Sequence, residues 1–117
     1  MLRRVLADSG ADRALVDLLR RDAVVYGGYS AGPCVLGPDL DELRHVDDIT
    51  AVAEPITAGL GLLDRPFVPH VDSPGHPETV ACSEIAAHYR EIGQSPWALS
   101  DGQVLIIDGQ AVELLPA

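Results

Sequence analysis

Ser30 lies in a sequence that is typical of a nucleophilic serine. The apolar run Ala23–Tyr26 leads into Gly-Tyr-Ser-Ala-Gly at residues 28–32. A Gly-x-Ser-x-Gly sequence after a buried strand predicts a nucleophile elbow, a sharp strand-to-helix turn that exposes the Ser30 hydroxyl. Because a hydroxyl is a weak nucleophile at neutral pH, the motif predicts catalysis only if a histidine base and an orienting carboxylate reach Ser30. The alternative interpretation is an ordinary glycine-serine turn.

The candidate base is His70, which follows the apolar residues Phe67 and Val68. The ends of strands that face the same edge as an elbow are where α/β sheets gather their chemistry. The alternative is a structural histidine that is hydrogen-bonded at the end of a strand.

The candidate carboxylates are Asp47 and Asp48. They lie between Ser30 and His70 in the chain, which matches the order Ser…Asp…His of several hydrolases. A solvated surface turn is the alternative for both aspartates.

A metal site is the competing interpretation of the segment around His70. His70, Asp72 and His76 form His-x-Asp-x3-His, which could supply nitrogen and oxygen ligands to zinc or manganese. Pro74 and Gly75 indicate an irregular loop with no fixed ligand face, so we expect neither a metal nor another cofactor.

The composition excludes several classes of function. The 117 residues carry a formal net charge of −10 and contain no lysine. Nucleic acid and anionic membrane surfaces are therefore unexpected partners, and lysine-dependent phosphate loops and Schiff-base chemistry are excluded. Cys34 and Cys82 form no Cys-x-x-Cys pair, which indicates a reducing cytoplasm rather than a disulfide scaffold. No apolar run approaches membrane-spanning length.

The chain length and an apolar content of 47% predict one folded domain over residues 1–117. The pattern of apolar residues predicts helices at 2–6 and 15–19, a central parallel strand at 23–26 and a long acidic loop at 38–57. It then predicts a strand at 67–70, a helix at 77–91 and strands at 97–99, 104–107 and 112–115. Turn signals at 100–102 and 108–109 predict hairpins between the last three strands. The expected fold class is α/β, with a mostly parallel sheet and a C-terminal β-hairpin.

Three linked motifs resemble the dipeptidase E and cyanophycinase-like serine peptidases. They are Tyr26–Gly32, then Gly-Leu-Gly-Leu-Leu at 59–63 leading to Val-Pro-His at 68–70, and Leu-Ser-Asp-Gly-Gln at 99–103 leading to Ile-Ile-Asp-Gly at 106–109. The resemblance covers most of the chain. It implies a fold similar to class I glutamine amidotransferases, with this chain forming part of a three-layer sandwich.

The resemblance also implies roles for particular residues. Ser30 would be the nucleophile, His70 the base and the Ala31 N–H an oxyanion donor, with Asp48 the better match for the third member and Asp47 the second. The implied activity is hydrolysis of short peptides with an acidic residue at the cleavage point, or of an aspartate-based polymer. No arginine follows His70 until Arg90, so the sequence itself does not support selection of aspartate.

Members of that family also have an N-terminal half, which supplies parallel strands and the second oxyanion donor. The resemblance covers only the C-terminal half, so we expect an N-terminally truncated domain. The expected partners are a peptide substrate and either a second copy or a complementing chain. The alternative function is an inactive remnant that acts as a binding or assembly module.

Overall fold

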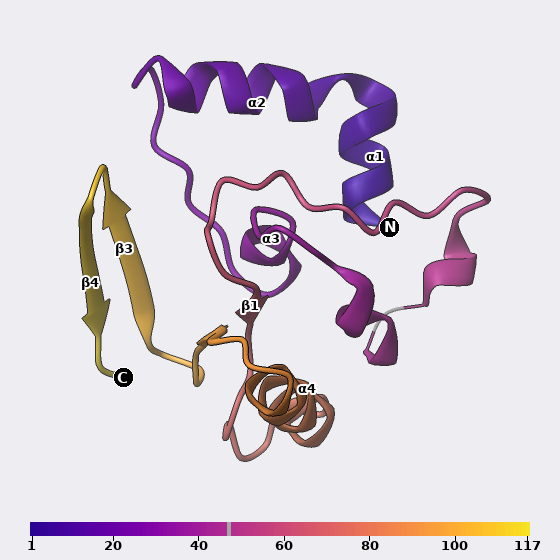
Figure 1. The fold of residues 1–117 in the computed structure, drawn as a ribbon, viewed down its shortest axis with the longest axis vertical. Coiled ribbons are helices and arrows are strands. Elements are labelled where there is room, and N and C mark those ends of the chain that lie inside the picture. Colours follow the sequence, from indigo (N-terminus) through magenta and orange to yellow (C-terminus); the bar gives the residue numbers. More distant parts are fainter. Residues whose placement is uncertain (47) are drawn as a thin grey trace.

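The structure is a computed structural model that describes residues 1–46 and 48–117. It begins with two helices, α1 (Leu2–Ser9) and α2 (Ala11–Arg20), which confirm the helical spacing of the N-terminal apolar residues. The helices meet at Gly10, whose φ of 78° is the left-handed conformation that ends many helices. Both lie along one side of the molecule (Figure 1).

A small parallel sheet lies at the centre. Strand β1 (Phe67–Val68) pairs in parallel with β2 (Trp97–Ala98), and α4 (Thr79–Glu91) connects them in the chain. A parallel pair needs such a crossover because both strands run in the same direction. The buried face of α4 packs against Val68 and Val71 and forms the main core. Val80 of the same helix does not join this core and is 68% exposed.

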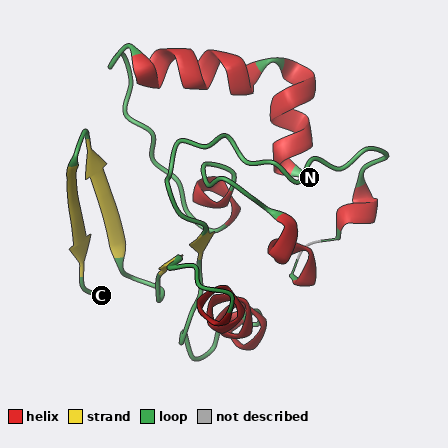
Figure 2. Cartoon of the chain, viewed as in Figure 1, coloured by secondary structure: helices red, strands yellow, loops and turns green. Residues whose placement is uncertain are grey.

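The chain ends in an antiparallel hairpin of β3 (Val104–Asp108) and β4 (Ala111–Leu115), as predicted. In Figure 2 this hairpin stands apart from the helices. The other predicted hairpin is wrong. Residues 100–102 do form a turn, but β2 pairs with β1 and β3 pairs with β4, so the turn connects two separate sheets.

The predicted central strand at 23–26 is also wrong. The structure assigns no strand to this segment, and Val25 is 97% exposed. A strand needs hydrogen-bonded neighbours as well as apolar side chains, and no described segment pairs with residues 23–26. The short helix α3 (Ala31–Cys34) follows directly. In the predicted acidic loop at 38–57, the described residues include the 3-10 helices η1 (Asp41–His45) and η2 (Ile49–Ala51).

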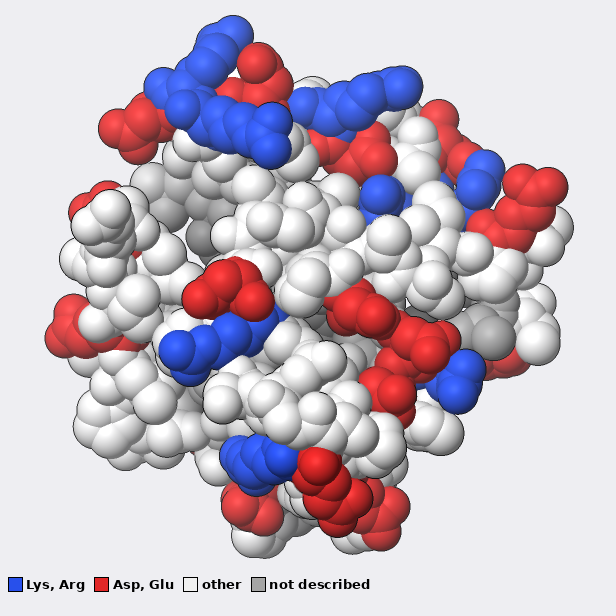
Figure 3. Space-filling model, viewed as in Figure 1, with Lys and Arg blue, Asp and Glu red and all other residues white. Residues whose placement is uncertain are grey.

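The chain therefore has a mixed α/β structure with a small parallel sheet and a C-terminal antiparallel hairpin. Among the described helices, none has the length and apolar character needed to cross a membrane. Figure 3 shows arginine side chains gathered over α1 and α2 with acidic side chains among them, and both kinds spread over the rest of that face.

Candidate active site

Ser30 occupies a strained turn at the start of α3. Its φ of 54° and ψ of −116° lie outside the usual regions for a residue with a side chain. Two hydrogen bonds brace the turn. The Tyr26 hydroxyl donates to the Gly32 carbonyl oxygen at 2.7 Å, and the Cys34 thiol donates to the Ser30 carbonyl oxygen at 3.2 Å. Burial raises the pKa of Tyr26, so its hydroxyl keeps the proton that it donates. The elbow predicted from the sequence is thus present as a backbone conformation.

The two glycines of the motif leave room for Tyr26. A Cβ atom on Gly28 would lie 3.0 Å from Tyr26 Cε1 and 3.3 Å from Pro33 Cδ, and one on Gly32 would lie 3.4 Å from the Tyr26 hydroxyl. A side chain at position 28 would therefore crowd the Tyr26 ring, whereas a Cβ on Gly32 would make an almost ordinary van der Waals contact. The space around the turn gives a steric reason for the first glycine of the Gly-x-Ser-x-Gly pattern.

The structure brings His70 to Ser30. His70 Nε2 lies 3.1 Å from Ser30 Oγ, and on the other side of the ring Nδ1 lies 2.6 Å from Asp101 Oδ1. When Nδ1 carries a proton and donates it to the carboxylate, Nε2 is left free to accept the hydroxyl proton. The His70 side chain is 13% exposed, so the imidazole is largely shielded from water.

Asp101 reaches His70 because β1 and β2 are parallel. The carboxyl ends of parallel neighbours lie at the same edge of a sheet, so the residues that follow β1 and β2 come together. Backbone hydrogen bonds continue this pairing, from Leu99 N–H to the Val68 oxygen and from Val71 N–H to the Leu99 oxygen, both at 3.0 Å. His70 and Asp101 then project from the two adjacent loops.

Ser73 ties these two loops together. Its side chain is buried, its hydroxyl donates to the Val71 carbonyl oxygen at 3.1 Å, and it accepts the Asp101 N–H at 2.8 Å. This role of Ser73 was not predicted from the sequence. Because its role depends on a contact across 28 residues, local sequence carries no signal for it.

Asp48, the carboxylate favoured from the sequence, does not contact His70 in the structure. Its Oδ1 accepts hydrogen bonds from the Thr50 hydroxyl and N–H at 2.5 and 2.8 Å, and these bonds lower the pKa of Asp48. Asp47 lies outside the described residues. Among the residues that the structure describes, the carboxylate hydrogen-bonded to His70 is that of Asp101, which gives the order Ser…His…Asp in the chain. The signal for it was the Asp-Gly turn after an apolar strand, which was interpreted only as a hairpin.

His76 also reaches this site. Its ring stacks on the His70 ring with centroids 3.6 Å apart and planes 9° from parallel. His76 Nδ1 accepts the Glu78 N–H at 3.1 Å, which fixes the orientation of the ring. His70, His76 and Glu78 have potential metal-ligand atoms within 4.8 Å of one another. Asp72, which belonged to the metal site considered from the sequence, is hydrogen-bonded to Ser83 instead. A metal on this set would compete with Ser30 or Asp101 for His70.

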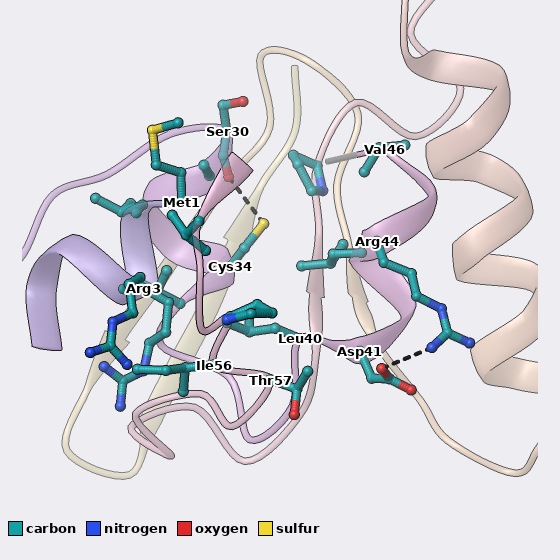
Figure 4. A pocket seen from close by; sticks show the side chains of 18 of the residues that line it. Met1, Arg3, Ser30, Cys34, Leu40, Asp41, Arg44, Val46, Ile56 and Thr57 are labelled. Carbon is teal, nitrogen blue, oxygen red and sulfur yellow. Dashed lines mark hydrogen bonds and ion pairs between the residues drawn. The ribbon is translucent and has the colours of Figure 1, made fainter. Parts of the chain in front are cut away.

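A cavity of about 250 Å³ adjoins the elbow and is lined in part by Ser30 and Ala31. Figure 4 shows Ser30 at one edge of this cavity, with Ile56 and Thr57 at the opposite edge. Ala31 is the first residue of α3, and the N–H groups of a first helical turn have no acceptor within the helix. The site therefore combines a serine, a histidine, a carboxylate, a backbone N–H donor and an adjoining cavity.

Comparisons with known proteins give a family and a similar fold. The model of peptidase family S51 matches residues 1–115. The chain is also similar to a 1.5 Å crystal structure of a candidate peptidase E protein from Listeria monocytogenes EGD-e, with 22% sequence identity and a TM-score of 0.85. That similarity covers 99% of this chain and 54% of the other, so the chain spans about half the length of that protein. No curated protein matched the sequence.

Proposed function

Because the chain belongs to peptidase family S51, as the resemblance of its motifs predicted, we propose that it is a serine-type peptidase that hydrolyses short peptides at Ser30. The observation that supports this most strongly is the continuous series of contacts from Ser30 Oγ through the His70 ring to Asp101. A hydroxyl, an imidazole and a carboxylate in this order are the parts that acyl transfer requires.

At the level of the fold, we propose that the small parallel sheet is part of the three-layer sandwich typical of such peptidases.

The proposed reaction has two acyl-transfer steps. His70 Nε2 takes the proton of Ser30 as Oγ attacks the carbonyl carbon of the peptide, and the Ala31 N–H stabilises the negative oxygen that forms. His70 then gives the proton to the leaving amine as the C–N bond breaks. In the second step His70 takes a proton from water, the oxygen of that water attacks the acyl carbon, and Ser30 recovers its proton when the ester bond breaks.

Asp101 has an orienting role in this proposal. Its carboxylate accepts the Nδ1 proton of His70, which holds the imidazole in the tautomer whose Nε2 can act as a base. It also stabilises the positive imidazolium that forms during each step. Asp101 is itself held by Ser73.

The test is hydrolysis of a mixed dipeptide library, followed by mass spectrometry of the products. The unmodified chain should release free amino acids, and Ser30→Ala and His70→Ala should each lose this activity. Ser95→Ala is the matched control, because Ser95 is an exposed serine outside the site. Activity that survives in Ser30→Ala would contradict the proposal. A folded chain with no hydrolysis would contradict it too, and would favour the binding or assembly module.

A further inference from the structure

The cavity beside Ser30 has mainly aliphatic walls. Five of the branched aliphatic side chains that line it are partly buried: Leu40, Leu43, Val46, Val52 and Ile56. They come from the loop between α3 and β1, which includes the predicted acidic loop at 38–57. In Figure 4 several of them lie across the cavity from the elbow.

The arginines that line this cavity are already paired with carboxylates of the chain. All three that line it form ion pairs with aspartates of the same chain. The pairs are Arg3 with Asp12, Arg4 with Asp8 and Arg44 with Asp41, with N–O distances of 3.0, 2.6 and 3.2 Å. Arg3 and Arg4 also donate to backbone carbonyl oxygens of Ala58 and Glu54.

An acidic substrate side chain would therefore compete for each arginine with a carboxylate already in place. It would also meet the carboxylate of Glu78, which lines the cavity as Asp41 does, in a chain with a net charge of −10. Burying a carboxylate without a cation or several donors is costly, whereas burying an apolar side chain against aliphatic walls is favourable.

We propose that this cavity binds the side chain of the residue that supplies the scissile carbonyl, and that it selects aliphatic or aromatic side chains over acidic ones. The inference rests on the proposed function. The acyl group stays bonded to Ser30 through both steps, so its side chain must find space beside the elbow throughout the reaction. An apolar cavity of about 150 Å³ is large enough to bind benzene. The observed volume of about 250 Å³ thus accommodates a leucine or phenylalanine side chain.

The test compares p-nitrophenyl esters of N-acetyl-leucine and N-acetyl-phenylalanine with the corresponding α-ester of N-acetyl-aspartate. The leaving group is the same in all three, so differences in kcat/KM report the acyl side alone. We expect the leucyl and phenylalanyl esters to exceed the aspartyl ester by about tenfold or more, in the range that apolar pockets achieve. Equal rates, or a faster aspartyl ester, would overturn the inference while leaving the Ser30 mechanism intact.

A substitution within the cavity sharpens the test. Ile56→Arg places an unpaired cation on the cavity wall and should reverse the preference, lowering kcat/KM for the leucyl ester and raising it for the aspartyl ester. Ile92→Arg is the matched control, because Ile92 is 53% exposed at the far end of α4. An unchanged preference in Ile56→Arg, with the chain folded by circular dichroism, would count against the inference.

Binding can be measured independently of turnover. N-acetyl-leucinamide, added to the isotope-labelled chain, should shift the amide NMR signals of Leu43, Val46 and Ile56, and N-acetyl-aspartamide should not. If these shifts occur but no ester is hydrolysed, the proposed function fails and the apolar binding site stands. If the leucine ligand produces no shifts at these residues, the inference fails whatever the activity.

Discussion

Asp101 Oδ1 lies 2.6 Å from His70 Nδ1, although the two residues are 31 positions apart in the chain. The contact follows from the parallel pairing of β1 with β2, because both residues come shortly after the carboxyl ends of these strands. Among the acidic side chains that the structure describes, the contact identifies Asp101 as the one placed to orient the candidate base.

Replacing Asp101 with asparagine should slow hydrolysis strongly. The asparagine side chain would keep the shape of the carboxylate but could not favour the protonated Nδ1 of His70, and the comparable change in serine proteases costs about 10⁴-fold in kcat. Since the Asp101 side chain is 51% exposed and thus partly screened by water, we expect a loss of about 10²–10⁴-fold in kcat. Asp48→Asn is the control and should leave kcat unchanged. A larger loss in Asp48→Asn than in Asp101→Asn would contradict this assignment.

Removing the ring of His76 should lower kcat and leave KM almost unchanged. His76→Ala frees one face of the His70 ring, and displacement of a catalytic group by about 1 Å can cost roughly 10²-fold. His76→Phe retains a flat ring in the same place and should recover most of the activity. Steady-state kinetics of the two variants provide the comparison. Equal losses in both would show that stacking does not position His70.

A chelator should leave the activity unchanged. Both ring nitrogens of His70 are engaged, one with Ser30 and one with Asp101, so the working arrangement has no nitrogen to offer a metal. Hydrolysis should proceed at the same rate after dialysis against EDTA as before. Activity that disappears with EDTA and returns with zinc or manganese would instead support a metal site at His70, His76 and Glu78.

Tyr89 should make the folded state sensitive to high pH. Burial raises the pKa of Tyr89, so the folded state favours the neutral phenol. This stabilisation is complete below the unfolded pKa of about 10 and is lost as the pH rises above that value. Tyr89→Phe should therefore have a smaller loss of unfolding free energy between pH 8 and pH 11, measured by urea denaturation.

At neutral pH, Tyr89→Phe should have nearly the same free energy of unfolding as the unmodified chain. Within the described part of the chain, the buried Tyr89 hydroxyl has no hydrogen-bond partner, so its removal should change the free energy of unfolding by less than about 1 kcal/mol. Tyr29→Phe is the control at both pH values, since Tyr29 is 89% exposed. A Tyr89→Phe chain as sensitive to high pH as Tyr29→Phe would contradict this account.

Features that depend on neighbouring residues could be predicted from the sequence. The helical periodicity of α4 and the Asp-Gly turn of the final hairpin are local signals, and both elements are present. The strained elbow at Ser30 was also predictable, because Gly28 and Gly32 flank it in a local motif, and the structure shows a steric reason for Gly28. His70 was predictable because it follows an apolar strand.

Features that depend on pairing between distant segments could not be predicted in the same way. Residues 23–26 are apolar enough for a central strand, but strand formation requires a partner that the pattern does not reveal. Asp101 was not among the candidate carboxylates for a related reason. Asp48 satisfied the expected order in the chain, whereas Asp101 is brought to His70 by the register between β1 and β2, which no local motif encodes.

The most direct test of the central claim is the position at which a fluorophosphonate probe attaches to the chain. The probe reacts covalently with an activated serine, and tandem mass spectrometry identifies the modified residue. The contact of 3.1 Å between Ser30 Oγ and His70 Nε2 predicts a single adduct on Ser30, formed at least about 10²-fold more slowly in His70→Ala, in line with the contribution of a general base. An adduct on another serine, or the same rate of labelling at Ser30 without His70, would contradict it.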